Sequence, residues 1–381
     1  MHPINMWKIC LAGLAVPLVL AHPGEHEKHD ARAAIQKRAF KEHAYRGLEK
    51  CAKRFESSGF NARAEERRRS IYNLHRRQLA TRDTDDVLNK SHLVNDTSIT
   101  VDTSADALFG TGATCVLNPE GETGPYYVKG ELIRSDILEN EPGVPIALDF
   151  QFVDVETCEP IEDLYSDIWN CNATGVYSGL VANGNGNTAD TSNLDATFLR
   201  GIQKTDSDGV LQFKTLFPGH YSGRATHHHI VAHLDVTVLP NNTISGGTVA
   251  HIGQLFWDQD LIYEIEATSP YSENTVSITT NADDRVFSDE TSGSTSDPVL
   301  SYVRLGDSLS DGLFGWITVA VNKSATYDPN YSFVYTSDGG VAQSGGGTDN
   351  VNGGGPSGGF PSGSSGAAPT GAGGPPSGSF A

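Results

Sequence analysis

The 381-residue chain is predicted to fold mainly as β-strands, in an antiparallel β-sandwich with an α-helical N-terminal extension and a disordered C-terminal tail. Three observations predict this. From about residue 114, short segments of alternating polar and apolar residues follow one another between turns rich in Gly, Pro, Asn and Asp. Residues 30–79 are dominated by Ala, Arg, Glu, Lys and Leu, which favour helix. Residues 338–381 are rich in Gly, Ser and Pro and cannot bury apolar surface.

The first 21 residues have the pattern of a secretory signal peptide. Lys8 precedes an apolar run from Ile9 to Leu20, and Val19 and Ala21 suit the positions on which signal cleavage depends. The run is short for a membrane span, and no later segment is apolar enough for one. We therefore expect a secreted, extracellular protein. Six glycosylation sequons agree with this; they begin at Asn89, Asn95, Asn172, Asn241, Asn322 and Asn330.

Four cysteines remain once the signal peptide and its Cys10 are removed: Cys51, Cys115, Cys158 and Cys171. An even number of cysteines in an oxidising compartment predicts two disulfides, and three pairings are possible. The sequence does not choose among these pairings. None of the spacings is Cys-x-x-Cys, so the cysteines give no indication of a zinc site.

Residues 22–82 form a basic segment in a chain whose formal net charge is −20. Ser57 to Asn61 are expected to divide its helical part into two helices. Three roles stay open: an arm that docks on the acidic body, an arm that joins two copies in a homodimer, or a propeptide. The third role arises because Arg76-Arg77 is a dibasic site after which the chain could be cut. The acidic body argues against nucleic acid and anionic membranes as partners.

Residues 83–113 are rich in Thr, Ser and Asp and are predicted to be a linker, and residues 114–337 are predicted to form the β-sandwich domain. Alternation is clearest from Val144 to Val155, where every second residue is apolar. Further strands are expected at Leu164 to Trp169, Val210 to Thr215, His227 to Leu239, Ala250 to Trp257, Thr275 to Thr280 and Trp316 to Val321.

The segment that begins at Tyr221 contains candidate metal ligands. On a strand, His227 and His229 point to the same face and lie roughly 6.5 to 7 Å apart along the strand, so one metal ion could bind both. Tyr221 is close enough in the chain to join them, whereas His228 should face the other way. Adjacent histidines on a surface strand can also bind metal without any function, so this segment alone leaves the question open.

Other motifs accompany these residues in a definite order. They are Thr123-Gly124-Pro125-Tyr126-Tyr127, the segment from Asp167 to Ser178, Thr205-Asp206-Ser207-Asp208-Gly209, Arg224-Ala225-Thr226-His227-His228-His229, and the segment from Gly253 to Asp258. In this order and spacing, about residues 114–265 resemble the intradiol ring-cleavage dioxygenases, and most of all their secreted fungal branch. The Tyr…Tyr…Arg-x-x-His-x-His series is the specific part of this resemblance.

The resemblance implies a mononuclear, non-haem Fe(III) site held by Tyr177, Tyr221, His227 and His229. The residue types suit that ion, because phenolate oxygen is a hard, anionic ligand that favours Fe(III) and imidazole also binds iron. Binding must lower the pKa of each tyrosine far below its reference value of about 10.

The activity that the resemblance implies is cleavage of catechols or lignin-derived aromatic diols by O₂, between the two hydroxylated carbons. Tyr221 would leave the metal and act as an internal base. Arg224 would stabilise negative charge that develops near the ring, and Gln254 would orient the oxygenated intermediate. His220, His233 and His251 have no matching role, and we expect them to be structural or to line the pocket.

Two features depart from the family pattern. Residues 178–195 form an insertion rich in Gly, Asn and Thr that could be a lid or a substrate loop, and the sequon at Asn172 lies beside Tyr177. One alternative is a secreted β-sandwich binding or cell-wall protein without activity. A zinc or copper hydrolase is disfavoured, because two tyrosine ligands are unusual for either metal and no Glu accompanies the histidines as a general base.

Overall fold

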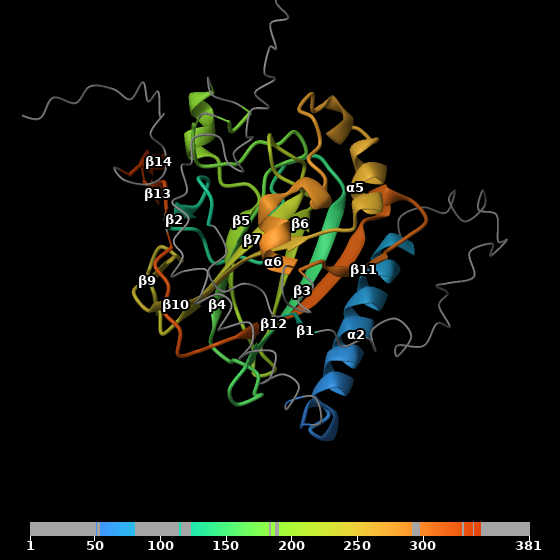
Figure 1. The fold of residues 1–381 in the computed structure, drawn as a ribbon, viewed down its shortest axis with the longest axis vertical. Coiled ribbons are helices and arrows are strands. Elements are labelled where there is room, and N and C mark those ends of the chain that lie inside the picture. The colour runs from blue at the N-terminus through green and yellow to red at the C-terminus, as the bar shows by residue number, and fades with distance from the viewer. Residues whose placement is uncertain are drawn as a thin grey trace, which may run out of the picture. The chain divides into compact units, whose positions relative to one another are not determined.

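The computed structural model describes residues 51, 54–80, 114–115, 123–182, 184–186, 190–291, 298–329, 331–337 and 339–343. The helices are α2 (Phe60–Ala80), α5 (Gln259–Glu266) and α6 (Arg285–Thr291), with short 3-10 helices η1 (Thr191–Asp195), η2 (Tyr271–Glu273), η3 (Asn281–Asp283) and η4 (Leu309–Asp311). The strands are β1 (Thr114–Cys115), β2 (Val128–Lys129), β3 (Pro145–Asp154), β4 (Tyr165–Trp169), β5 (Arg200–Lys204), β6 (Val210–Leu216), β7 (His227–Leu234), β8 (Thr237–Val238), β9 (Ile244–Ser245), β10 (Thr248–Phe256), β11 (Ser301–Arg304), β12 (Leu313–Val321), β13 (Phe333–Thr336) and β14 (Gly339–Ala342). The mainly-β fold predicted from the sequence is confirmed (Figure 1).

Two sheets enclose the main hydrophobic core. The first sheet has the strand order β1-β12-β3-β6, with β11 also paired to β12, and the second has the order β10-β7-β4-β5. Alternate residues of β3, such as Leu148 and Phe150, meet Ile168 of β4 and Ile230 of β7 in one buried cluster. This packing follows from the period of two along each strand, which places every second side chain in the core. The other face of the second sheet is thereby left for a different cluster of residues.

The first sheet is mixed rather than wholly antiparallel, which corrects the prediction in one respect. The pairs β12–β3 and β1–β12 are parallel, whereas the second sheet is antiparallel at every pair. Parallel neighbours need a long connection, and more than 150 residues separate β3 from β12 in the chain. Alternation within a strand carries no information about such a distant partner.

Two of the predicted strands differ in the structure. Thr275 to Thr280 carries no strand, and the backbone of Val276 is tied by hydrogen bonds to Asn274 and His220 instead. The strand expected from His227 to Leu239 ends at Leu234, because Asp235 adopts a positive φ of 56° that a strand cannot continue through.

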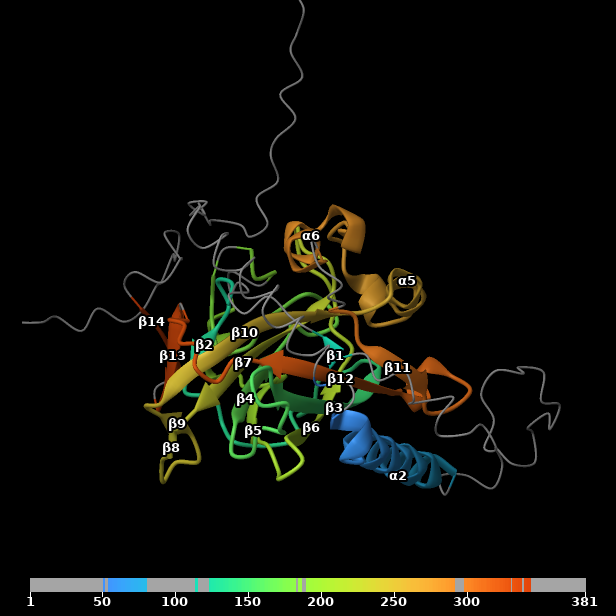
Figure 2. The ribbon, with the colours of Figure 1, turned by 60° about the horizontal axis from the view of Figure 1, so that its bottom comes forward.

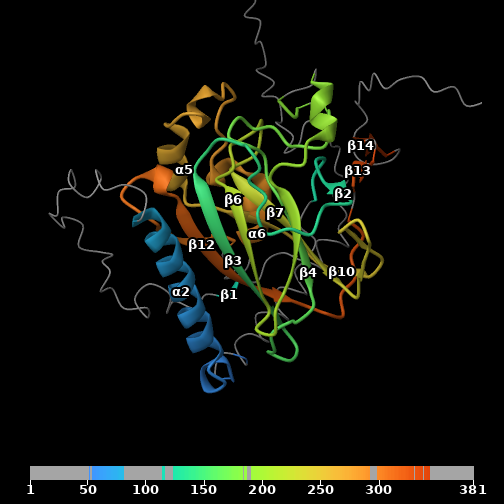
Figure 3. The ribbon, with the colours of Figure 1, turned by 180° about the vertical axis from the view of Figure 1, so that it is seen from behind.

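Helix α2 of the basic arm docks on the outer face of the first sheet. Gly59, with φ of 70°, divides the helical region as predicted, and α2 then lies beside β3 and β12 (Figures 1 and 3). Arg67 and Arg68 both donate to the carboxylate of Asp149, which is fully buried on β3. The helix therefore covers a face that would otherwise expose apolar side chains. The proposed dimer and the cut after Arg77 stay predictions.

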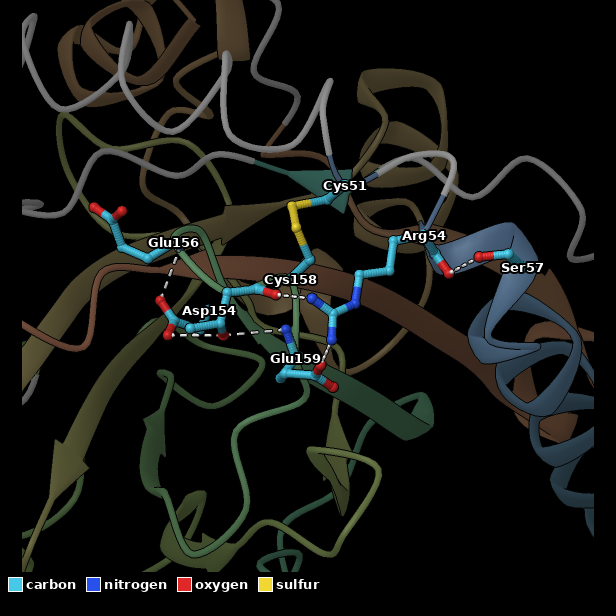
Figure 4. The surroundings of a disulfide bond; sticks show 8 residues. Cys51, Arg54, Ser57, Asp154, Glu156, Cys158 and Glu159 are labelled. Carbon is cyan, nitrogen blue, oxygen red and sulfur yellow. Dashed lines mark hydrogen bonds and ion pairs between the residues drawn. A yellow bond between two sulfur atoms is a disulfide. The ribbon is translucent and has the colours of Figure 1, made fainter.

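A disulfide between Cys51 and Cys158 fastens the chain just before α2 to the body (Figure 4). Arg54 beside it donates to the carbonyl of Thr157, 3.0 Å away, and pairs with Glu159. Cys171 carries a free, buried thiol, so the predicted second disulfide through this residue is wrong. Among the described residues, none of the helices is both long and apolar enough to cross a membrane.

Candidate metal centre and active site

The two candidate histidine ligands lie on the face of the second sheet that points away from the main core. β7 is the inner strand between β10 and β4, so its backbone is held on both sides (Figure 2). His229 pairs with Gln254 of β10 and with Trp169 of β4 across the sheet, and His227 pairs with Phe256. A site built on such a strand is held more rigidly than one on a loop.

The side chains of His227, His229 and Tyr221 converge. The two Nε2 atoms of His227 and His229 lie 3.0 Å apart, and the Tyr221 hydroxyl lies 3.3 Å from Nε2 of His227. Nδ1 of His227 is 2.6 Å from the carbonyl of Ala225. Because a carbonyl can only accept, Nδ1 carries the proton and Nε2 presents a lone pair, which is the tautomer a metal ligand needs.

Tyr177 reaches the same cluster from the segment that follows β4. Its ring centroid is 5.5 Å from that of Tyr221 and 6.2 Å from that of His229. Its hydroxyl is buried and makes no hydrogen bond of normal geometry with the residues that the structure describes. Burial, reinforced by the neighbouring Tyr221, raises the pKa of Tyr177 well above 10, so a phenolate here would need a cation beside it.

Glycines allow the two tyrosine-bearing segments to approach each other closely. A Cβ at Gly175, which has a positive φ of 84°, would lie 2.2 Å from the carbonyl oxygen of His220, next to Tyr221. A Cβ at Gly219 would lie 2.4 Å from the carbonyl oxygen of Ala173. Both contacts are too short for any side chain, so glycine is required at both positions.

Arg224 and Gln254 join the four candidate ligands. The guanidinium of Arg224 contacts the side-chain oxygen of Gln254, and its Nη1 lies 3.4 Å from the Tyr221 hydroxyl. Burial raises the pKa of Tyr221 despite the opposing effect of Arg224. The six residues that the sequence singled out (Tyr177, Tyr221, Arg224, His227, His229 and Gln254) are therefore gathered at one place.

Asp284 is a member of the site that the sequence reasoning missed. Its Oδ2 accepts from Nε of Arg224 at 2.8 Å and from the backbone N–H of Ala225 at 2.7 Å, and its Oδ1 accepts from the N–H of Phe287. Although burial lowers the pKa of Arg224, Tyr221 and Asp284 raise it overall. An Asp at the start of a helix is a recognisable cap, but its link to an arginine 60 residues away has no sequence signal.

An aromatic column lies beside His229 and was also missed. Trp169 stacks on His229, and Tyr127 stacks on Trp169, each at a centroid distance of 4.6 Å. The hydroxyl of Tyr127 donates to Asp167 at 2.8 Å, and Nε2 of His233 lies 2.9 Å from the same carboxylate oxygen. His233, expected to be structural or to line the pocket, thus supports this column through the carboxylate of Asp167.

Three histidines of the β-strand region, His220, His228 and His251, do not belong to the donor cluster. His228 points into the main core, where its Nδ1 lies 3.1 Å from the side-chain oxygen of Asn170. His220 is bound between Glu266 and the carbonyl of Val276, and His251 is fully buried. These positions agree with the structural roles expected for His220 and His251.

The Asn172 side chain, in the sequon beside Tyr177, is engaged in local hydrogen bonds. Its side-chain oxygen accepts from the backbone of Thr174 and of Val176, and its Nδ2 donates to Glu141 at 2.9 Å. A glycan on Nδ2 would have to displace the Glu141 contact. We therefore expect this sequon to stay unmodified in the folded protein.

The donor set fits a ferric ion better than zinc or copper. Among the described residues, no three His, Cys, Asp or Glu side chains form a metal-binding group, so the candidate site depends on its tyrosines. Two phenols and two imidazoles converge, the buried Tyr177 hydroxyl makes no hydrogen bond of normal geometry within the described part of the chain, and one imidazole is held in the ligand tautomer. Two hard phenolate oxygens match the charge of Fe(III).

Comparison with known proteins gives one family. A family model described as Dioxygenase matches residues 122–242. An intradiol ring-cleavage dioxygenase from Tetranychus urticae is 32% identical, with a TM-score of 0.46, and the match covers 56% of this chain and 98% of that chain. A second solved dioxygenase is 31% identical over 56% of this chain and 98% of its own, with a TM-score of 0.45.

The dioxygenase domain of a dioxygenase carbohydrate-binding protein fusion from Streptomyces sp. SirexAA-E is 21% identical, with a TM-score of 0.34, over 54% of this chain and 97% of that chain. No curated protein matches the chain. The fungal branch expected from the sequence stays a prediction. Because 32% identity extends over 98% of the Tetranychus urticae protein, the chain belongs to the intradiol ring-cleavage dioxygenase family.

Proposed function

We propose that this dioxygenase binds one non-haem Fe(III) through Tyr177, Tyr221, His227 and His229, and that it opens aromatic diols of the catechol class between their hydroxylated carbons with O₂. The observation that carries the proposal is the convergence of the four side chains, with Nε2 of His227 within 3.3 Å of both the Tyr221 hydroxyl and Nε2 of His229. When bound, ferric iron would supply the Lewis-acidic centre at which the diol meets O₂.

Tyr221 is the residue suited to take a proton from the substrate. Its hydroxyl oxygen lies beside both His227 and Arg224, and burial raises its pKa, so its phenolate is a strong base in this environment. A proton taken from the substrate would be held at that oxygen. The contact of Arg224 with the Tyr221 hydroxyl supports Tyr221 as the proton acceptor, and Tyr177 would then be the tyrosine that remains a ligand.

Arg224 is suited to stabilise negative charge as it develops on the substrate. Its guanidinium is fully buried, is held from one side by Asp284, and contacts Gln254. A preoriented charge in a site with little water stabilises a transition state more than the same charge in solvent. Gln254, on strand β10, is held in one orientation by this contact, and its side-chain amide would help Arg224 to position the substrate.

The test is the visible absorption spectrum of the purified protein, together with its iron content, before and after a catechol is added without oxygen. About one iron per chain and a tyrosinate charge-transfer band that the catechol shifts are expected. Tyr177→Phe should lose or shift this band. A protein that stays colourless after incubation with ferric salt would overturn the proposal and favour a binding protein without activity.

We also propose that the protein is secreted and glycosylated. The signal-like segment before residue 22 and the disulfide between Cys51 and Cys158 support secretion, because disulfides persist in oxidising compartments. The exposed Asn241 is a better acceptor than the engaged Asn172. The test compares the protein in cells and in the medium, by N-terminal sequencing and by mass with and without deglycosylation; protein found only in the cells with its first residues intact would argue against secretion.

A further inference from the structure

The insertion at residues 178–195 contributes two buried asparagines that face the chain at Tyr177. Asn185 is fully buried and Asn193 nearly so, although both belong to a loop rich in small polar residues. Burying a side-chain amide is unfavourable unless its hydrogen bonds are made. The partners of these amides therefore indicate what the loop is built to hold.

Asn185 binds both sides of the Tyr177 backbone. Its Oδ1 accepts from the N–H of Tyr177 at 2.7 Å, and its Nδ2 donates to the carbonyl of Tyr177 at 2.9 Å. This is the pair of hydrogen bonds that a neighbouring strand would make, supplied here by one side chain. Asn193 adds a second donor to the same carbonyl at 2.7 Å and also donates to the carbonyl of Leu180.

The next residue, Ser178, is tied to the second sheet. Nε of Arg200, on β5, donates to the carbonyl of Ser178 at 3.0 Å, and the Ser178 hydroxyl donates to the carbonyl of Phe198 at 2.6 Å. The Arg200 guanidinium also lies 5.8 Å from the centre of the Tyr177 ring. Tyr177 is outside any strand, yet its backbone is held between the insertion and the sheet.

We propose that Asn185 is a positioning residue for the Tyr177 ligand, and that the insertion acts as a clasp on this ligand rather than as a lid over the substrate. The inference rests on the proposed ferric site. A ligand on a loop places its oxygen no more accurately than its backbone is held, and supporting groups of this kind commonly change metal affinity by 10- to 100-fold. The hydrogen bonds from Asn185 hold the backbone of Tyr177 in place, as the neighbouring strands hold the backbones of His227 and His229.

The experiment compares Asn185→Asp and Asn185→Ala with the unchanged protein. Asp has the same shape but cannot donate to the Tyr177 carbonyl, whereas Ala loses both hydrogen bonds. Ser192→Ala is the matched control, because it removes an exposed hydrogen bond to Asp190 in the same insertion without touching Tyr177. Asn193→Ala is a milder variant for use if Asn185→Ala does not fold. Each protein is measured for ferric iron affinity, charge-transfer spectrum and thermal midpoint without metal.

Both Asn185 variants should bind ferric iron on the order of 10-fold more weakly and show a shifted tyrosinate band, while Ser192→Ala matches the unchanged protein. An unchanged affinity and band in folded Asn185→Asp would overturn the inference. A raised KM for the diol with an unchanged spectrum would favour the lid instead. If the unchanged protein itself lacks the band, the proposed function fails first, so the two failures are distinguishable.

Discussion

The indole ring of Trp169 lies parallel to the imidazole ring of His229, with 4.6 Å between their centroids and 2° between their planes. The two residues are direct cross-strand neighbours on β4 and β7, so the register of the sheet produces the stack. The plane of a histidine ligand determines where its Nε2 lone pair points. Trp169 therefore restricts the orientation of His229 without having to touch a metal ion.

Replacing Trp169 should weaken metal binding as well as stability. Trp169→Leu removes the flat surface against His229, and we expect about 10-fold weaker ferric iron binding with a shifted visible band, whereas Trp169→Phe should show a smaller shift. Trp316→Leu is the matched control, because this residue is buried under the arm, away from the site. Equal losses of stability with an unchanged spectrum in both Leu variants would contradict a role for the stack.

Replacing Asp284 should slow the reaction through Arg224. Asp284→Asn keeps the shape of the side chain but loses the charge that Arg224 pairs with, and we expect kcat to fall on the order of 10-fold with a smaller change in KM. Asp283→Asn is the control, since the neighbouring Asp283 is exposed and binds Thr280. Steady-state kinetics at equal iron content provide the comparison; equal kcat in the two variants would rule out this role.

Removing the buried carboxylate under the arm should destabilise the fold. Asp149→Ala leaves Arg67 and Arg68 without their buried partner, and the expected loss is about 3–5 kcal/mol of unfolding free energy. Asp208→Ala breaks an ion pair with Arg63 that is partly exposed, so its loss should be below about 1 kcal/mol. Urea denaturation measures both. Similar values would mean that the arm does not depend on Asp149.

Acid should destabilise the protein through two buried histidines. Burial lowers the pKa of His228 and of His251 to about 3, below the ordinary value of 6.5, so both stay neutral in the folded protein. The unfolded chain binds more protons as pH falls below 6.5. The free energy of unfolding therefore decreases as the pH falls from 6.5 toward 3. The decrease is up to about 1.4 kcal/mol per pH unit for each of the two histidines.

The check is the thermal midpoint between pH 7 and pH 4 for the unchanged protein and for His251→Leu. The variant should lose less stability than the unchanged protein over this range, because one of the two buried imidazoles is gone. Parallel curves would show that His251 takes up no additional proton on unfolding.

The sequence by itself determined the candidate site and the mainly-β fold. The period of two in β7 set His227 and His229 on one face and His228 on the other, because side-chain direction in a strand depends only on position. Arg224 and Gln254 came from the family resemblance. The break before α2 followed from Gly59, which adopts a positive φ at no steric cost.

Contacts between residues that are far apart in the sequence were decided only by the tertiary structure. The parallel pairing of β12 with β3, the docking of α2 on Asp149, and the contacts of Asp284 with Arg224 and of Asn185 with Tyr177 follow no local pattern. Local sequence sets the direction of a side chain and the conformation of a turn. The groups that a side chain then contacts depend on how the whole chain packs. A buried polar group without a hydrogen bond is unfavourable, and its partner can come from any part of the chain.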